Sequence, residues 1–305
     1  MLPKKNPCLK VLCISGGGVK FSIPATVLAE MEASTGKRIV DMFDLIVGTS
    51  AGGIIAAALG AGKPAAEIAD MYQSKAGVIF GRTLAQKVIS ADGLTGPKYQ
   101  AGGLHDTVKD FLGSQSIKTS QVPILVTSAD FYTLNLQLFK SWTGDFDQFS
   151  FSDIALASSA APTYFPAYKT RGYQFIDGGM FANYPVLIGM EEGFKAGYSA
   201  ENIRMLSIGT GFLPQKGFDS TGWGDIQWIR HNGGTPIIDT VFELTKQKDL
   251  YLAGQRLGDN FYHADVELLN DSMDDVSAQN LNALKLAGQK LAASDGLQQF
   301  LKKLL

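Results

Sequence analysis

The chain has 305 residues, of which 45% are hydrophobic and 18% charged, a composition typical of a globular protein with a sizeable core. The formal net charge of −2 gives no electrostatic reason to expect a nucleic-acid partner or attraction to an anionic membrane. Two cysteines and three scattered histidines do not complete a structural zinc site, so we expect no metal.

The first seven residues carry charge, but no apolar signal region follows them. Apolar runs elsewhere are short and are interrupted by glycine or charge, so we expect no transmembrane helix. These features predict a cytoplasmic protein, with export that needs no signal peptide left open.

A glycine-rich turn follows the first expected strand, Leu9–Ile14, and precedes a helix over about 22–33. Such turns bind anions through free backbone N–H groups. The turn lacks the Gly-Lys-Ser/Thr of a P-loop, and Phe21 stands where a dinucleotide fingerprint has its third glycine. Two interpretations remain: a tight strand-to-helix turn, or an oxyanion hole built from the N–H groups of Gly17 and Gly18.

The second strand, Leu45–Val47, leads into Gly48-Thr49-Ser50-Ala51-Gly52 and a helix that reaches about residue 61. This is the Gly-x-Ser-x-Gly pattern of a nucleophile elbow. The serine sits in a strained turn, and the two glycines let strand and helix pass closely. The helix N-terminus favours developing negative charge. Taken alone, the pattern fits a turn of small residues equally well.

The middle of the chain begins with a helix over 64–75, in which Pro64 takes the first helical position. Residues 77–103 are rich in glycine and read as an irregular loop with a short helix over 84–89. The next helix is expected over 104–112, opened by His105. The loop's apolar residues either form a lipid-facing lid or pack beneath it: Val78, Ile79, Phe80 and Leu94.

Two strands over 123–129 and 134–139 are joined by a turn, and the second alternates apolar and polar residues. A helix over 152–160 follows, with Ser152 as its cap and Asp153 in its first turn.

A further strand, Tyr173–Ile176, ends in Asp177-Gly178-Gly179. An aspartate there is either a turn former or a carboxylate that a close-approaching loop holds against the serine.

The remaining elements are a helix over 185–196, a buried strand over 204–208, a helix over 237–257, an edge strand over 261–268, and amphipathic helices over 281–293 and 297–305. We find no repeat or linker. We therefore expect a single domain over 1–305, on which residues 212–305 pack as a C-terminal helical extension.

A serine nucleophile needs a base. The order Ser50…Asp177…His263 matches an α/β-hydrolase triad, but the surroundings of His105, His231 and His263 favour structural or surface roles. The alternative is Asp177 itself, because partial burial raises the pKa of a carboxylate and a direct hydrogen bond supplies the geometry.

Five motifs in this order resemble those of the patatin-like phospholipase family, over residues 9–211. They are Ser15-Gly16-Gly17-Gly18-Val19-Lys20, Gly48-Thr49-Ser50-Ala51-Gly52-Gly53, Ala157-Ser158-Ser159-Ala160-Ala161-Pro162, Asp177-Gly178-Gly179 with Asn183 and Pro185, and Ser207-Ile208-Gly209-Thr210-Gly211.

The resemblance implies a three-layer α/β/α fold with a mostly parallel central sheet. It implies acyl hydrolysis of phospholipids or related esters by a Ser50–Asp177 dyad, without a catalytic histidine, metal or cofactor. The implied oxyanion hole consists of Gly16, Gly17 and Gly18. The implied supporting residues are Lys20, Gly48, Gly52, Gly178, Gly179 and Asn183.

Two residues depart from the family pattern. Ser15 stands where the family often has Asp or Gly, and Phe21 where a glycine usually follows the basic residue. Phe21 could narrow the oxyanion loop or fill a pocket.

The implied partners are a lipid ester and, transiently, a membrane surface. Some bacterial members are regulated membrane-degrading effectors, including nucleotide-activated ones, so a small-molecule activator and a homo-oligomer stay open. Two other functions compete: a Ser–His acyltransferase or esterase using His231 or His263, and a non-catalytic lipid- or nucleotide-binding module.

Overall fold

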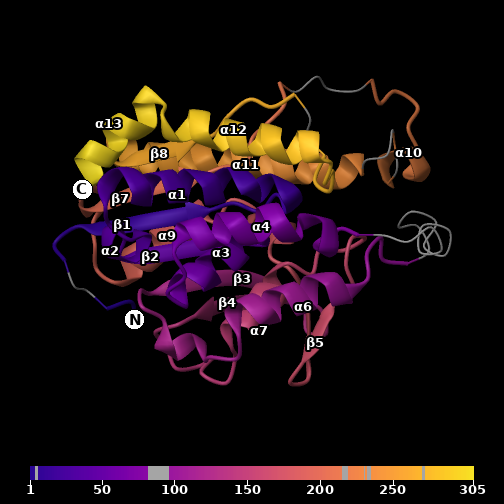
Figure 1. The fold of residues 1–305 in the computed structure, drawn as a ribbon, viewed down its shortest axis with the longest axis horizontal. Helices are drawn as coiled ribbons and strands as arrows, with labels where there is room; N and C mark the ends of the chain where they lie inside the picture. The colour runs from indigo at the N-terminus through magenta and orange to yellow at the C-terminus, as the bar shows by residue number, and fades with distance from the viewer. Residues whose placement is uncertain (4–5, 82–95, 215–218, 230, 232–234, 270–271) are drawn as a thin grey trace.

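The computed structural model describes residues 1–3, 6–81, 96–214, 219–229, 231, 235–269 and 272–305. These residues form an α/β/α sandwich in which helices cover both faces of one central sheet (Figure 1). The predicted three-layer fold with a mostly parallel sheet is confirmed. Among the described helices, none combines the length and the apolar character that crossing a bilayer requires.

The sheet has eight strands among the described residues, in the order β5-β6-β3-β2-β1-β7-β8, with β4 also paired to β3. The parallel strands are β1 (Leu9–Ile14), β2 (Leu45–Thr49), β3 (Ile124–Asp130), β7 (Ile203–Ile208) and β8 (Phe261–Ala264). The antiparallel strands are β4 (Asn135–Lys140), β5 (Tyr168–Thr170) and β6 (Tyr173–Asp177). Because parallel strands share a direction, the loops that follow β1, β2 and β7 meet at one edge of the sheet.

Strands β2 and β6 meet end to end along the same side of β3. The last residue of β2, Thr49, pairs with Thr127, and the last residue of β6, Asp177, pairs with Ser128. Strand β4 occupies the other side of β3 through this stretch, so β2 and β6 share the remaining side. The residue after Thr49 and the carboxylate of Asp177 are thereby brought together.

Alternation along the strands separates two cores, one on each face of the sheet. In β1, Leu12 and Ile14 belong to one core, whereas Val11 and Cys13 belong to the other. Burial on both faces explains why β1 reads as a continuous apolar run.

Seven helices with residues in the first core are α1 (Ser22–Thr35), α3 (Ala51–Gly60), α4 (Ala65–Ile79), α6 (Ala101–Leu112), α7 (Phe151–Ser158), α12 (Ala278–Ala292) and α13 (Asp295–Leu304). Helices α9 (Val186–Lys195) and α11 (Pro236–Leu257) pack on the other face. Short helices are α2 (Ile39–Met42), α8 (Gly179–Ala182), α10 (Asp225–Ile229) and the 3-10 turns η1 (Gly18–Phe21), η3 (Ile117–Thr119), η4 (Ala200–Asn202) and η5 (Gly258–Asn260).

The C-terminal part of the chain joins the same framework. Strand β8 pairs with β7 as the edge strand that the sequence predicted, and α12 lies along α1 (Figure 1).

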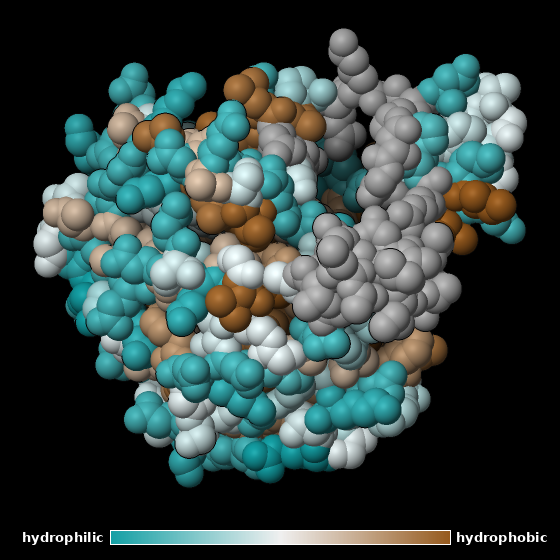
Figure 2. Space-filling view, turned by 45° about the vertical axis from the view of Figure 1, so that its right-hand side comes forward, coloured by the Kyte–Doolittle hydropathy of each residue, from teal (hydrophilic) through white to brown (hydrophobic). Residues whose placement is uncertain are grey.

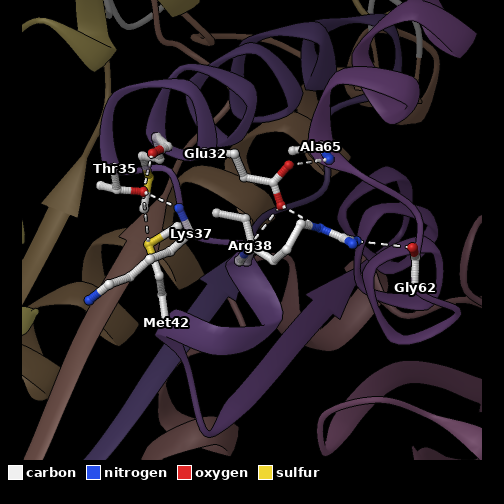
Figure 3. A network of polar contacts seen from close by, with 9 residues as sticks. Glu32, Thr35, Lys37, Arg38, Met42, Gly62 and Ala65 are labelled. Atoms are coloured by element: carbon white, nitrogen blue, oxygen red, sulfur yellow. Dashed lines mark hydrogen bonds and ion pairs between the residues drawn. The ribbon is translucent and has the colours of Figure 1, made fainter.

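One partly buried carboxylate joins the end of α1 to the starts of two other helices (Figure 3). Glu32 Oε1 accepts the N–H of Ile39 at 2.9 Å, and Glu32 Oε2 accepts the N–H of Ala65 at 2.8 Å. Arg38 contacts Oε1 at 3.4 Å and donates to the carbonyl of Gly62 at 2.9 Å. Because α4 starts at this clamp, Glu32 fixes the origin of the helix that runs back toward the cavity described below.

Several predicted boundaries were wrong. The cap of α7 is Ser150, not Ser152, because Ser150 exchanges hydrogen bonds with Asp153 in a capping box. Pro64 precedes α4 as its cap, and His105 lies inside α6 instead of opening it.

The irregular loop predicted over 77–103 is shorter than expected, since α4 extends to Ile79 and α6 starts at Ala101. The predicted helix over 84–89 and Leu94 lie outside the described residues.

Candidate active site

Ser50 occupies a strained turn between β2 and α3. Its φ of 56° and ψ of −125° lie in a region that side chains other than glycine rarely adopt. A Cβ at Gly48 would collide with the carbonyl oxygen of Gly52, and one at Gly52 would collide with that of Ile14. The two glycines of the pattern are therefore required by close backbone approach, which projects Ser50 from the strand end.

Asp177 is the direct partner of Ser50. The hydroxyl Oγ of Ser50 donates to Oδ2 of Asp177 at 2.6 Å, and the N–H of Gly179 donates to Oδ1 at 2.6 Å. Gly178 makes this approach feasible, because a Cβ there would collide with Thr127 on β3. Asp177 is 5% exposed, and the two hydrogen bonds hold its carboxylate in one orientation.

Burial raises the pKa of Asp177 to about 6, although the hydrogen bonds from Ser50 and Gly179 act in the opposite direction. A carboxylate with this pKa is ionised at neutral pH and is a stronger base than an ordinary aspartate.

Two further hydroxyl groups hold the elbow. The N–H of Ser50 donates to Oγ of Ser158, on α7, at 2.7 Å. Thr49 Oγ1 donates to the carbonyl of Ala182 at 2.7 Å and lies 2.8 Å from Thr127 Oγ1. The strained residue is thus fixed by the helix on one side and by β3 and α8 on the other.

The glycine turn after β1 lies against Ser50. A Cβ placed on Gly16 would come within 2.9 Å of Ser50 Cβ and would collide with Oδ1 of Asn183. The N–H of Gly16 donates to the carbonyl of Asn183 at 3.1 Å, so it is already engaged. Within the described part of the chain, no acceptor pairs with the N–H of Gly17 or Gly18.

A cavity of about 460 Å³ opens above these groups. Both Ser50 and Asp177 line it, together with Lys20 and the three glycines of the turn. Its apolar lining includes Ile54, Tyr72, Ile79, Phe80, Leu104, Phe165, Ile238 and Phe242. Charged side chains also line it: Lys98, Asp239, Glu243, Lys246 and Asp274. The lining therefore combines apolar and charged groups around the dyad, as a site for a ligand with an apolar tail and a polar head would.

Four residues singled out in the sequence differ in their position relative to the cavity. Ile79 and Phe80, expected in a lid or beneath one, line the cavity, whereas Val78 is exposed. Phe21 is fully buried, its ring packs edge-on to Tyr72, and it is not among the cavity-lining residues. Phe21 therefore fills core space behind the glycine turn.

No described histidine lines the cavity or is bonded to Ser50 or Asp177. His263 Nδ1 lies 3.0 Å from Ser207 Oγ, and its Nε2 lies 3.4 Å from Asp265. Ser207 is fully buried, so this trio cannot meet a substrate. Across the described ranges, no cluster of three or more metal-ligating side chains occurs.

Sequence reasoning missed some residues that hold the site. Ser158 lay in a quoted motif, but nothing local indicated its bond to Ser50. The backbone carbonyl of Met273 accepts the N–H of Val19 at 2.8 Å, and a backbone contact of this kind leaves no signal in side-chain patterns.

Comparisons with known proteins agree with the fold and the motifs. The family model described as "Patatin-like phospholipase" matches residues 12–190. "Patatin-like protein 2" of Arabidopsis thaliana is 29% identical over 347 aligned residues, which cover 95% of this chain and 84% of that protein. A protein of Pseudomonas aeruginosa named "cGAMP-activated phospholipase" is 33% identical over 283 aligned residues, which cover 89% of this chain and 82% of that protein.

Among solved structures, that of VipD from Legionella pneumophila matches with a TM-score of 0.50 and 12% identity, over 98% of this chain and 67% of that chain. This likeness concerns the fold alone.

Proposed function

The chain belongs to the patatin-like phospholipase family, and on that premise we propose that it hydrolyses ester bonds of phospholipids or related lipids with a Ser50–Asp177 dyad. The observation that carries the proposal is the 2.6 Å bond from Ser50 Oγ to Asp177 Oδ2 in a cavity that apolar side chains line in part.

In the proposed first step, Ser50 Oγ attacks the ester carbonyl while Asp177 accepts the hydroxyl proton. The N–H groups of Gly17 and Gly18 stabilise the resulting oxyanion, because they point from a turn that packs on Ser50 and pair with no described acceptor. Asp177 then returns the proton to the departing alcohol, which leaves an acyl group on Ser50.

In the second step, Asp177 takes a proton from a water molecule that attacks the acyl group. The tetrahedral intermediate collapses, the fatty acid leaves and Ser50 recovers its proton. The family resemblance implies that Gly16 is a third donor. Its N–H is bonded to Asn183, so we now assign it a supporting role and keep two donors.

The cavity walls support a lipid substrate. Ile54, Ile79 and Phe80 provide an apolar path for an acyl chain, and Lys20 adds positive potential near the reacting ester. Helix α11 contributes Phe242 to the lining and exposes Val241 on its outer side. Figure 2 shows hydrophobic residues gathered near the middle of one face of the molecule, a feature compatible with transient contact with a bilayer.

Regulation is a separate question that one relative makes testable. The similarity to the protein named "cGAMP-activated phospholipase" makes cyclic dinucleotides the first activators to add to the assay.

The test is fatty-acid release from mixed phospholipid vesicles, with and without cyclic dinucleotides, by wild type, Ser50→Ala and Asp177→Asn. Of these three proteins only wild type should release fatty acid, with each variant folded as judged by circular dichroism. His231→Ala and His263→Ala serve as controls that should retain turnover. Hydrolysis that persists at the wild-type rate in Ser50→Ala would contradict the proposal. Lipid binding without turnover would favour a binding module, and loss of turnover in a folded histidine variant would favour a Ser–His mechanism.

A further inference from the structure

The glycine turn is held from outside by a segment near the C-terminus. The carbonyl oxygen of Met273 accepts the N–H of Val19 at 2.8 Å. The same oxygen occupies the space that a Cβ on Gly18 would need, and Gly18 has a φ of 56°. The direction of the Gly18 N–H is therefore set jointly by the turn and by the position of Met273.

The carboxylate of Asp274 fixes the segment that carries Met273. Its Oδ2 accepts hydrogen bonds from Nζ of Lys98 at 2.5 Å and from the hydroxyl of Tyr99 at 2.5 Å. Its Oδ1 accepts one from the hydroxyl of Ser272 at 3.1 Å. Burial opposes ionisation of Asp274, but the bonds from Lys98 and Tyr99 outweigh it and hold the pKa below its ordinary value. The Asp274 carboxylate is thus ionised at neutral pH, and its hydrogen bonds from Lys98 and Tyr99 are charge-assisted.

Lys98 and Tyr99 are themselves anchored to the body of the protein. The N–H of Lys98 donates to the carbonyl of Thr163 at 2.8 Å, and the N–H of Tyr99 donates to that of Tyr164 at 2.8 Å. The ring of Tyr99 is 3% exposed and packs against Phe165. A continuous set of contacts therefore runs from the core through Asp274 to the glycine turn.

We propose that Asp274 is a positioning residue for the acyl-transfer site: it holds the Met273 carbonyl against Gly18 and Val19 and so directs the oxyanion donors. The inference rests on the proposed function. It gives a role to the part of the chain beyond residue 190, where the family match ends. Asp274 lines the cavity but makes no bond to Ser50 or Asp177, so the separate measurement of kcat and KM distinguishes an effect through the turn from a direct effect on substrate binding.

The test compares Asp274→Asn with Asp275→Asn in the full chain. The control removes the same charge one residue away, where the carboxylate accepts the N–H of Ser277 and does not line the cavity. Turnover of a soluble ester and the rate at which a fluorophosphonate labels Ser50 are measured. The phosphonyl oxygen of this probe takes the place of the oxyanion.

In Asp274→Asn, kcat and the labelling rate should both fall by about tenfold to a hundredfold, while KM changes by less than about twofold. Asp275→Asn should match wild type. Tyr99→Phe, which keeps the packed ring and removes one bond to Asp274, should show the same split with a smaller loss. This second variant keeps the test open if Asp274→Asn does not fold.

Three outcomes overturn the inference. If Asp274→Asn keeps the wild-type kcat and labelling rate, Asp274 does not position the donors, and the proposed function stands. If it loses thermal stability while its folded fraction retains full kcat, its role is structural only. A wild type that neither hydrolyses esters nor reacts with the probe overturns the proposed function and this inference together.

Discussion

The hydroxyl of Ser158 accepts the backbone N–H of Ser50 at 2.7 Å, so a serine of α7 holds the strained residue that follows β2. The side chain of Ser158 is fully buried, and a Cβ on Gly53 would come within 2.7 Å of its hydroxyl oxygen. The bond is therefore closely packed and shielded from bulk water.

Removal of that hydroxyl should weaken both the fold and the proposed reaction. Ser158→Ala leaves the N–H of Ser50 buried without an acceptor, at a cost of about 1–3 kcal/mol. We expect Tm to fall by several degrees and kcat/KM by roughly tenfold. Differential scanning fluorimetry and ester turnover measure the two effects. Ser74→Ala, on the exposed side of α4, is the control, and a Ser158→Ala protein equal to it would exclude the holding role.

The pH dependence of hydrolysis should report the Asp177 carboxylate. Because burial raises its pKa to about 6, the base form is lost below that value. We expect kcat/KM to be level above the midpoint and to fall about tenfold per pH unit below it. Initial rates on a soluble ester give the profile, with folding checked at each pH. If the rate instead falls around pH 3.8, the ordinary pKa of an aspartate, the profile does not report a buried carboxylate.

Asp177 should also lower the stability of the protein at neutral pH. Its pKa is raised from 3.8 to about 6, so between these values the folded state binds more protons than the unfolded state. Stability from this group therefore falls as the pH rises through the interval, by at most about 3 kcal/mol.

Asp177→Asn removes that cost together with the proposed base. The variant should be inactive, yet its Tm should exceed that of wild type by a few degrees at about pH 8 and converge with it near pH 4. Thermal melts across this range test the sign. A variant less stable than wild type at every pH would contradict the desolvation argument.

The hydrogen bonds that Glu32 accepts from the starts of α2 and α4 should contribute to stability but not directly to catalysis. Glu32→Ala removes the acceptor for the N–H groups of Ile39 and Ala65, for a cost of about 2–3 kcal/mol. Tm should fall by roughly 4–8 °C, and kcat of the folded protein should change little. Glu191→Ala, at an exposed i,i+4 pair, should leave Tm within about 1 °C of wild type. An unchanged Tm in Glu32→Ala would contradict the claim that Glu32 stabilises the starts of these two helices.

The sequence predicted the parts of the site that depend on local pattern. The Gly-x-Ser-x-Gly run specified both the turn at Ser50 and the glycines that its geometry requires, and the structure has both features. The strand ending at Asp177 also followed from local pattern. Their contact was one of two alternatives that the residues left open, and the resemblance selected it, because no local rule brings together residues 127 positions apart.

The errors also have physical causes. Ser150 and Ser152 both precede Asp153 closely, but only a residue three positions before the carboxylate can form a capping box, and that residue is Ser150. The roles of Met273 and Asp274 depend on tertiary contacts with Val19 and Lys98, which sequence periodicity does not encode.

Because β2 and β6 meet end to end along β3, the register of β6 decides whether the side chain of Asp177 points toward Ser50. Asp177 pairs with Ser128, one position beyond the partner of Thr49, and successive side chains of a strand point to opposite faces. An inserted or deleted residue between Phe175 and Asp177 would therefore turn the carboxylate away from Ser50, not merely move it. Evolution and engineering can vary the length of the turn before β6 gradually. Within β6, a change of one residue abolishes the contact between Ser50 and Asp177 instead of weakening it.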